Sequence, residues 1–585
     1  MRTDRLKVLL LGGYGTFGGR LARLLADEAR LTLVIAGRSQ AKAQAFCAGL
    51  STKAAVVPLL FDRERALEPQ LRAIEPDVIV DASGPFQAYG VDPYRVVRAA
   101  LALGINYLDL ADGSDFVKGI AQFDGQARAK GLFMLAGVSS FPVLTAAVIR
   151  RLSEGVARLD TVLGGIAPSP HANVGLNVIR AIASYAGTPV KLRREGRDAT
   201  GYALIESVRY TIAPPGRIPL DPIRFSLVDV PDLQVVPQLW PSLRSVWLGA
   251  GPVPAIWHRA LSAFALAVRW RLVPSLSPLA GLMYRTMNRL VFGEHRGGMF
   301  VAVTGATPDG TRIARSWHMV AEGDDGPLIP SMAAEAIIRR CLAGLAPAPG
   351  ARPALTELEL ADYEALFARR RIMTGSLQEE PAAPPLPLYR RILGEAWDRL
   401  PPAIRMIHNM STALTAEGVA SIERGPGRLA NLVARLMRFP PAGRNVPVTV
   451  TFRARDGEEY WRRTFGSAAF ASVQKEGRGR FERLLCERFG PVTVGMALVA
   501  EADRLRLVVR RWSVLGLPLP RAWAPRGDVH ESAQDERFNF HVEIRHPLLG
   551  LIIRYRGWLN PNPVSRDEDC APLRPGSWQA RLGRL

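Results

Sequence analysis

Short apolar runs alternate with amphipathic stretches along the first 150 residues. Six of these runs read as buried strands: 7–11, 32–36, 55–60, 78–82, 107–110 and 132–136. Segments with a helical period, such as 18–27 and 93–103, lie between them. Unbroken apolar runs are typical of strands buried on both faces. Their alternation with helices predicts an α/β domain with a doubly wound parallel sheet over residues 1–150.

The pattern changes after residue 150 to longer, mixed segments. Residues 252–292 look helical and are rich in Leu, Ala and Trp. Residues 299–304 and 313–321 look like paired strands around the turn at 308–310, and 331–343 predicts a helix. These segments predict a second α/β domain over 151–375.

A proline-rich stretch separates this part from the rest of the chain. It predicts a linker over 376–388. Beyond it, 404–436 looks helical, and Phe538, Phe540, Val542 and Ile544 alternate with polar residues. That alternation is typical of an antiparallel sheet with one wet face. We therefore expect a mainly antiparallel β module with flanking helices over 389–565, followed by a tail over 566–585.

Composition narrows the classes of function. An apolar fraction of 48% favours a folded protein, and no apolar run reaches the ~18 residues of a spanning helix. We expect no signal peptide, because residues 1–7 are polar and the apolar run 8–11 stops at Gly12. The four cysteines match no disulfide or metal spacing, so we expect a cytoplasmic location. The net charge of +21 comes mostly from dispersed arginines, which predicts no nucleic-acid partner. No metal site is expected.

A glycine-rich turn stands between the first predicted strand and helix. Gly13, Gly15 and Gly18 form a G-x-G-x-x-G pattern that also contains Tyr14, Thr16 and Phe17. In a dinucleotide site the first glycine allows the tight turn, the second lets the backbone approach the pyrophosphate, and the third lets helix and strand pack closely. The helix N-terminus then faces the phosphates. The pattern therefore predicts a dinucleotide-binding loop.

The end of the second predicted strand indicates which dinucleotide binds. Enzymes that use NAD usually carry Asp or Glu there to bind the ribose 2′-hydroxyl. This chain has Arg38 and Ser39 instead, which suit a 2′-phosphate. We therefore expect NADP(H), with Asp62, after the third strand, near the adenine.

The loop after the fourth strand carries a family resemblance. Its Gly84-Pro85-Phe86 and Tyr89-Gly90, followed by Gly104-x-x-Tyr107-x-Asp109, resemble the saccharopine-dehydrogenase-like family over about residues 5–372. The resemblance implies a Rossmann-type domain, substrate bound between it and the second domain, and a segment after Pro330 that packs back on the first. Ligands of such sheets lie beyond the strand ends, so Ser83–Phe86 would lie under the ribose and nicotinamide.

The C-terminal region resembles family 4166 of the domains of unknown function over about residues 391–563. The matching motifs include 461–466, 487–491 and 517–520. The family carries no assigned chemistry. A curved sheet with one apolar face can enclose a ligand. Arginines such as Arg463 and Arg510 would bind an acid there, or would simply lie on solvated strand faces.

These features favour an NADP(H)-dependent oxidoreductase with hydride transfer between its first two domains. No catalytic acid or base is assigned. One alternative is a nucleotide-binding sensor or scaffold without turnover. Another is a reductase at the inner face of the membrane that acts on lipid or polyketide-like acyl substrates and touches the membrane through 252–292. The partner expected in each enzyme case is a small-molecule substrate, apolar or acyl, and a homodimer is left open.

Overall fold

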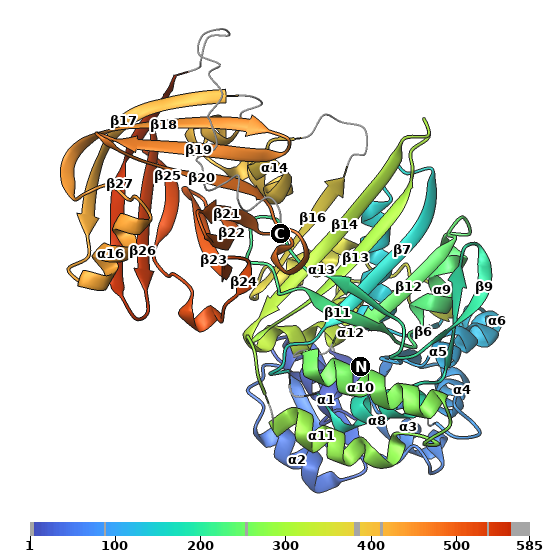
Figure 1. The fold of residues 1–585 in the computed structure, drawn as a ribbon. Helices are drawn as coiled ribbons and strands as arrows, with labels where there is room; N and C mark the ends of the chain where they lie inside the picture. Colours follow the sequence, from blue (N-terminus) through green and yellow to red (C-terminus); the bar gives the residue numbers. More distant parts are fainter. Residues whose placement is uncertain are drawn as a thin grey trace. The chain divides into compact units, whose positions relative to one another are not determined.

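The computed structural model describes residues 5–86, 89–172, 174–251, 255–289, 291–379, 386–409, 413–534 and 537–562. The chain divides into two compact units, residues 1–383 and 384–585 (Figure 1). The expected tail, 566–585, lies outside the described residues. No helix in the described part is both long and apolar enough to cross a membrane.

The first unit begins with a parallel sheet. Its strand order is β3-β2-β1-β4-β5-β6-β15, the order of a Rossmann fold with one strand added at the edge. The strands are β1 (Leu6–Leu11), β2 (Leu31–Gly37), β3 (Ala55–Leu60), β4 (Val78–Asp81), β5 (Asn106–Asp109), β6 (Phe133–Ala136) and β15 (Gly350–Pro353). All six predicted strands are confirmed. The apolar side chains of the inner strands are buried on both faces of the sheet, whereas those of edge strand β3 are half-buried or exposed.

Helices connect these strands and cover the sheet. They are α1 (Thr16–Leu25), α2 (Gln40–Ala48), α3 (Leu67–Ile74), α4 (Arg95–Leu103), α5 (Ser114–Gly119), α6 (Asp124–Ala129) and α7 (Thr145–Leu152). Each of α1, α3 and α4 presents leucine, valine or alanine to the sheet at helical spacing. The doubly wound α/β domain follows from this pattern.

A second sheet of the same unit has the order β10-β11-β12-β7-β13-β14-β16. Its strands are β7 (Arg158–Ala167), β10 (Ser207–Tyr210), β11 (Ile223–Leu227), β12 (Ser245–Ala250), β13 (Arg296–Ala306), β14 (Arg312–Glu322) and β16 (Ile372–Glu379). The predicted strand pair around 308–310 is confirmed as β13 and β14, which pair from Arg296↔Glu322 to Ala306↔Arg312. The helices here are α8 (Leu176–Tyr185), α9 (Asp232–Leu239), α10 (Ala255–Arg269) and α11 (Ala280–Arg289).

The chain then returns to the parallel sheet. Helix α12 (Ile329–Leu342) packs on α1, and the Ser331 hydroxyl donates a hydrogen bond to the backbone oxygen of Phe17 at 3.1 Å. Strand β15 then pairs parallel with β6, and α13 (Leu360–Phe367) follows it. The parallel sheet therefore includes residues that lie some 200 positions beyond its first six strands.

The expected linker is shorter than predicted at its N-terminal end. Residues 372–379 form β16, which pairs antiparallel with β14 from Ala321↔Ile372 to Ala314↔Glu379. Glycine and serine in this stretch suggested a loop, but backbone pairing at the sheet edge overrides that local preference. At the other end Leu388 already belongs to α14 (Leu388–Leu393). Residues 380–385 lie outside the described part.

The second unit is a closed antiparallel sheet. Ten strands of the described chain follow one another in the order β22-β21-β20-β19-β18-β17-β27-β26-β25-β23. The ring closes because β23 also pairs with β22. The short strand β24 (Leu517–Pro518) pairs with β23 outside the ring. They are β17 (Ala413–Arg424), β18 (Gly443–Arg455), β19 (Glu458–Phe465), β20 (Ala468–Glu476), β21 (Leu485–Phe489), β22 (Val492–Ala500), β23 (Arg504–Val514), β25 (Val529–Gln534), β26 (Arg537–His546) and β27 (Gly550–Asn562).

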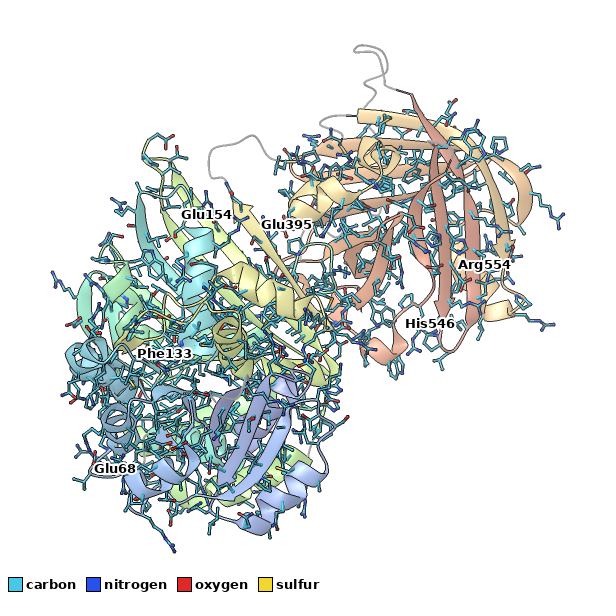
Figure 2. All side chains as sticks on the ribbon, turned by 180° about the vertical axis from the view of Figure 1, so that it is seen from behind. Glu68, Phe133, Glu154, Glu395, His546 and Arg554 are labelled. Carbon is cyan, nitrogen blue, oxygen red and sulfur yellow. The ribbon has the colours of Figure 1, made fainter. Side chains whose placement is uncertain are left out.

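The helical prediction for 404–436 is wrong in its middle. Two helices, α15 (Pro402–His408) and α16 (Arg428–Leu436), flank β17, which pairs with β18 and β27. Alanine and glutamate in β17 suggested a helix, but two neighbouring strands supply its backbone partners and decide its structure. Figure 2 shows His546 at one end of the sheet and Arg554 part-way along β27.

Candidate functional site

A cavity of about 740 Å³ opens at the carboxyl ends of the parallel strands in the first unit. Ten of the predicted site residues line it, and Gly13, Gly18 and Ser39 lie behind its wall. The lining residues among the predictions are Tyr14, Gly15, Thr16, Phe17, Arg38, Asp62, Ser83, Gly84, Pro85 and Phe86. The loops that follow β1, β2, β3 and β4 therefore all line this cavity, as expected for the ligand site of such a sheet.

The tight turn after β1 depends on a glycine that the sequence analysis missed. Gly12 has φ +71°, whereas Gly13 has an ordinary negative φ. Gly12 therefore adopts the left-handed conformation of this turn, and Gly13 follows it in the same turn. Gly13 is needed for space, because a Cβ there would lie 2.9 Å from the Leu10 carbonyl oxygen and 3.1 Å from the Ile35 side chain. The adjacent glycines at 12 and 13 were the available signal.

Gly15 and Gly18 have different constraints. A Cβ on Gly18 would lie 2.3 Å from the carbonyl oxygen of Gly12, so this position packs helix against loop. A Cβ on Gly15 would meet only that same oxygen, at 3.0 Å, and otherwise points to open space. Gly15 is the N-cap of α1, whose first turn carries no acidic residue. The free N–H groups and the positive dipole end of helix α1 therefore face the cavity, beside Thr16 and Phe17.

Tyr14 joins the glycine loop to the end of β2. Its hydroxyl accepts a hydrogen bond from the Ser39 N–H at 3.0 Å. Its ring lies so close to Gly37 that a Cβ on this glycine would be only 2.6 Å from the ring atoms. The Ser39 hydroxyl caps α2 by accepting from the Lys42 N–H at 3.4 Å. Arg38 is exposed, lines the cavity, and forms no ion pair with any described residue.

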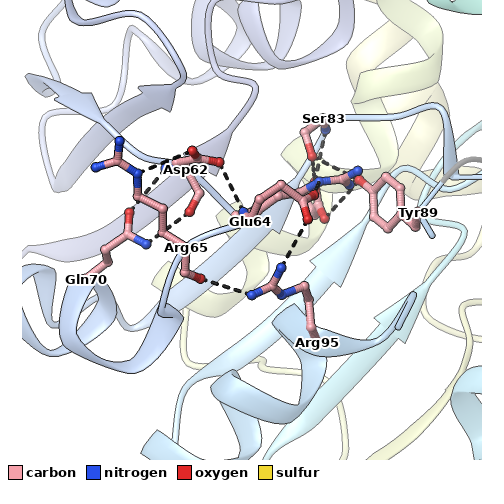
Figure 3. Close-up of polar contacts among 9 residues, drawn as sticks. Asp62, Glu64, Arg65, Gln70, Ser83, Tyr89 and Arg95 are labelled. Carbon is pink, nitrogen blue, oxygen red and sulfur yellow. Dashed lines mark hydrogen bonds and ion pairs between the residues drawn. The ribbon is translucent and has the colours of Figure 1, made fainter. Parts of the chain in front are cut away.

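Asp62 is held as a loop carboxylate after β3 (Figure 3). Its Oδ1 accepts from the Glu64 N–H at 3.1 Å, and Gln70 bridges its backbone N–H and carbonyl oxygen. Arg65 lies 3.6 Å from its other carboxylate oxygen. These contacts fix the loop around the cavity, while Asp62 remains part of the cavity wall.

A buried polar network lies under the Ser83–Phe86 loop. The Ser83 hydroxyl donates to Asp81 Oδ1 at 2.6 Å, and the Tyr89 hydroxyl donates to Asp81 Oδ2 at 3.1 Å (Figure 3). Burial raises the pKa of Asp81, and the hydrogen bonds from Ser83 and Tyr89 oppose that shift. The Arg63 guanidinium lies 3.5 Å from the centre of the Tyr89 ring. The Ser83 hydroxyl therefore donates its hydrogen bond to Asp81 and not to a ligand in the cavity.

Phe86 belongs to the same support. It is buried and its ring centre lies 4.6 Å from that of Tyr89 and 5.2 Å from that of Phe116. Sequence analysis named Ser83 and Phe86 but gave no role to Asp81. A carboxylate closing an otherwise apolar strand was the signal that could have identified it.

The other wall of the cavity comes from the second sheet and its connections. The Asn177 side-chain amide donates to the Gly84 carbonyl oxygen at 3.1 Å, so α8 contacts the loop after β4 directly. Arg180 on the same helix lines the cavity, with Asp112 from the loop after β5. Tyr185, at the end of α8, is half-buried, and loss of solvent, followed by the charges of Asp112 and Asp229, raises its pKa.

Asp109 stands just behind this end of the site. It is fully buried, and its Oδ1 accepts hydrogen bonds from the backbone N–H groups of Ala111 and Gly137 at 2.9 and 2.8 Å. Burial raises its pKa to about 7, against the effect of those hydrogen bonds. Asp109 therefore anchors the loops after β5 and β6 rather than facing the cavity.

Comparison with known proteins assigns the two ends of the chain. Residues 8–133 match the family model described as saccharopine dehydrogenase NADP binding domain. The N-terminal segment is therefore similar to the dinucleotide-binding domain of that family. Residues 400–559 match the domain of unknown function DUF4166. Both resemblances seen in the sequence are thereby confirmed. No curated protein matches the chain.

Solved structures resemble the first unit at low sequence identity. Saccharopine dehydrogenase (L-Glu forming) from Saccharomyces cerevisiae is 13% identical with a TM-score of 0.45, covering 64% of this chain and 100% of that one. A myo-inositol dehydrogenase from Corynebacterium glutamicum is 13% identical with a TM-score of 0.30, covering 65% and 100%. The WlbA dehydrogenase from Thermus thermophilus is 15% identical with a TM-score of 0.28, covering 61% and 94%.

Proposed function

We propose that the first unit is an NADP(H)-dependent oxidoreductase with its substrate bound against α8. The observation that carries the proposal is the continuity of the cavity. It runs from Arg38 and the glycine loop, past Ser83–Phe86, to Asn177, Arg180 and Val230 of the second part of the unit. A site for a dinucleotide alone has no need of the last three.

The residues present fit a dinucleotide. Gly15 leaves open space beside the first turn of α1, which a side chain at this position would fill. The N–H groups of this turn can donate hydrogen bonds to a pyrophosphate. Arg38 stands free at the end of β2 and would pair with a 2′-phosphate, with the N-terminus of α2 beside it. The bound nicotinamide would supply or accept a hydride.

The chain itself supplies orientation and polar groups. The network of Asp81, Ser83 and Tyr89 holds the loop after β4 in place, and Asn177 ties that loop to the substrate side. Among the described lining residues on that side, Asp112 and Arg180 carry charge. Arg180 would orient a carbonyl or carboxylate oxygen of the substrate, and Asp112 is the candidate for proton transfer.

The experiment uses NADPH deuterated at C4, on both faces, and an extract of small molecules from cells. Mass spectrometry should find compounds that gain one deuterium with the wild-type protein and not with Gly15→Val, which cannot hold the pyrophosphate. Asp112→Asn should lower the label at least about tenfold without changing NADPH affinity. A protein that binds NADPH and labels no compound would overturn the proposal in favour of the sensor.

A second candidate, a reductase of lipid or polyketide-like acyl substrates at a membrane surface, is favoured by α10 and α11. Large apolar side chains on and around these helices are exposed, beside Arg269, Arg271 and Arg285. They are Phe264, Trp270, Leu272, Leu279, Leu282 and Phe292. Exposed apolar side chains flanked by arginine suit the interface of an anionic membrane.

A further inference from the structure

The closed sheet of the second unit encloses a cavity of about 340 Å³. Its wall consists mainly of apolar side chains, such as Val450, Val494, Leu507 and Phe540. Strand β20 contributes the polar side chain of Gln474 to this wall. Ligand sites of proteins fall in the range of roughly 300–1,000 Å³ and are mostly apolar. An apolar cavity of this size holds water poorly and gains from taking up an apolar molecule.

One end of the ring is closed by the helices that precede β17. The Tyr389 hydroxyl on α14 donates to Gln474 Oε1 at 2.9 Å, and His408 on α15 lies 2.6 Å from Glu531. The intervening Leu393, Trp397, Leu400 and other apolar residues are buried. No entry for a ligand is expected at this end.

The charged groups deep in the cavity neutralise one another. The Arg463 guanidinium contacts Ser472 at 2.8 Å and Glu487 at 3.1 Å, and it also stacks on Trp461. The expectation that Arg463 binds an acid therefore has no support, because a carboxylate already occupies its charge. The interior suits an uncharged hydrocarbon chain instead.

The opposite end of the ring is covered by α16 (Figure 1). Val433 on this helix and Met437 just after it line the cavity, while Leu429, Leu432 and Leu436 point outward and are 53–74% exposed. Short segments at the same end, β24 among them, expose Leu515, Leu517, Trp523 and Leu548. The apolar face of α16 is therefore wider than the part that packs on the ring, and an exposed apolar patch of this kind indicates an apolar partner.

The charge of this end points to the kind of partner. The three segments 425–444, 515–527 and 545–551 contain seven arginines: Arg428, Arg435, Arg438, Arg444, Arg521, Arg526 and Arg545. Glu543, which lines the cavity, pairs with Arg545 at 2.6 Å, so Arg545 does not add to the positive charge of this end. Leucine and tryptophan among arginines match the interface of a bilayer that contains anionic lipid.

We propose that the second unit is a lipid-binding module. It takes one hydrocarbon chain of a lipid, tail first, into the cavity from an anionic membrane, through the end covered by α16. The head group then stays among the arginines at that end.

The test uses the full chain and cis-parinaric acid, a fluorescent fatty acid that accepts energy from tryptophans such as Trp461 and Trp512. The wild-type protein should bind it saturably. The double variant Val450→Phe, Val494→Phe fills the cavity and should bind at least about tenfold more weakly. The matched control Thr449→Phe, Thr493→Phe, on the outer face of the same strands, should bind like the wild type. Equal binding by the filled and control variants, or no binding by the wild type, overturns the proposal.

Entry is tested separately with variants that leave the cavity intact. Leu432→Glu, Leu436→Glu should slow uptake of parinarate from phosphatidylcholine–phosphatidylglycerol vesicles at least about fivefold and leave the affinity for free probe unchanged. Met406→Glu, an exposed apolar position on α15 at the closed end, should match the wild type. Uptake that does not depend on phosphatidylglycerol or on the leucines overturns the membrane route. Neither result depends on the activity of the first unit.

Discussion

The Tyr14 hydroxyl accepts a hydrogen bond from the Ser39 backbone N–H at 3.0 Å. This contact fixes the position of the glycine loop relative to the end of β2. The groups proposed to bind the pyrophosphate and the 2′-phosphate are therefore already in position before a ligand binds. Tyr14→Phe removes the hydrogen bond and keeps the ring over Gly37. Because such a bond contributes about 0.5–1.5 kcal/mol, NADPH affinity should fall roughly twofold to tenfold in a titration. An unchanged affinity would mean that the contact does not organise the site.

Gly15 and Gly18 form a matched pair. A methyl group at Gly15 meets mainly open cavity space, whereas one at Gly18 would lie 2.3 Å from a backbone oxygen. Gly15→Ala should therefore weaken NADPH binding with little change in melting temperature. Gly18→Ala should lower the free energy of unfolding by about 1–3 kcal/mol through overpacking. Calorimetry and titration of both variants check this, and equal destabilisation by the two would contradict the geometry.

Asp109 makes the stability of the first unit depend on pH. Its pKa is about 7 in the folded protein, above the ordinary value of 3.8. A raised pKa contributes stability that is fully present below pH ~4 and is lost as pH rises through ~7. The shift corresponds to at most about 4 kcal/mol. Asp109→Asn keeps the acceptor for Ala111 and Gly137, so unfolding by denaturant should depend less on pH between 4 and 8 in the variant. Parallel pH profiles would contradict the raised pKa.

The exposed apolar side chains around α10 and α11 predict membrane contact by the first unit. Trp270→Glu, Leu282→Glu should lower co-sedimentation with anionic vesicles at least about threefold, because each change removes apolar burial and adds repulsion. Parinarate binding by the second unit should not change. Vesicle binding equal to that of the wild type would leave these side chains with no role at a membrane.

The sequence predicts the parallel sheet and its glycine-rich loop well, because both depend on local patterns. Apolar runs such as 7–11 and the spacing of Gly13, Gly15 and Gly18 are visible along the chain. The roles of Gly12, Asp81 and Tyr14 are not, since each depends on a contact with another strand or loop. Strand β17 was mistaken for helix for the same reason, as its partners β18 and β27 lie far along the chain.

The arginines of the second unit show the same limit. The alternation of apolar and polar residues along β23 predicts that Arg510 lies with Arg504 and Arg506 on the solvent-facing side of the sheet. A register shift opposite Gly495 and Met496 instead leaves Arg510 buried. Such an irregularity in the pairing of two strands leaves no mark in the sequence of one strand.

The most direct test of the account is the choice of cofactor by the wild-type protein and by Arg38→Asp. Fluorescence titration should give an affinity for NADPH at least about tenfold higher than for NADH, which corresponds to ~1.4 kcal/mol. Arg38→Asp should reverse or abolish that preference, because a carboxylate repels the 2′-phosphate and suits a 2′-hydroxyl. Arg72→Asp, an exposed arginine on α3 that pairs with Glu68, should keep the preference of the wild type. Equal affinities for the two cofactors, or no saturable binding of either, would contradict the account.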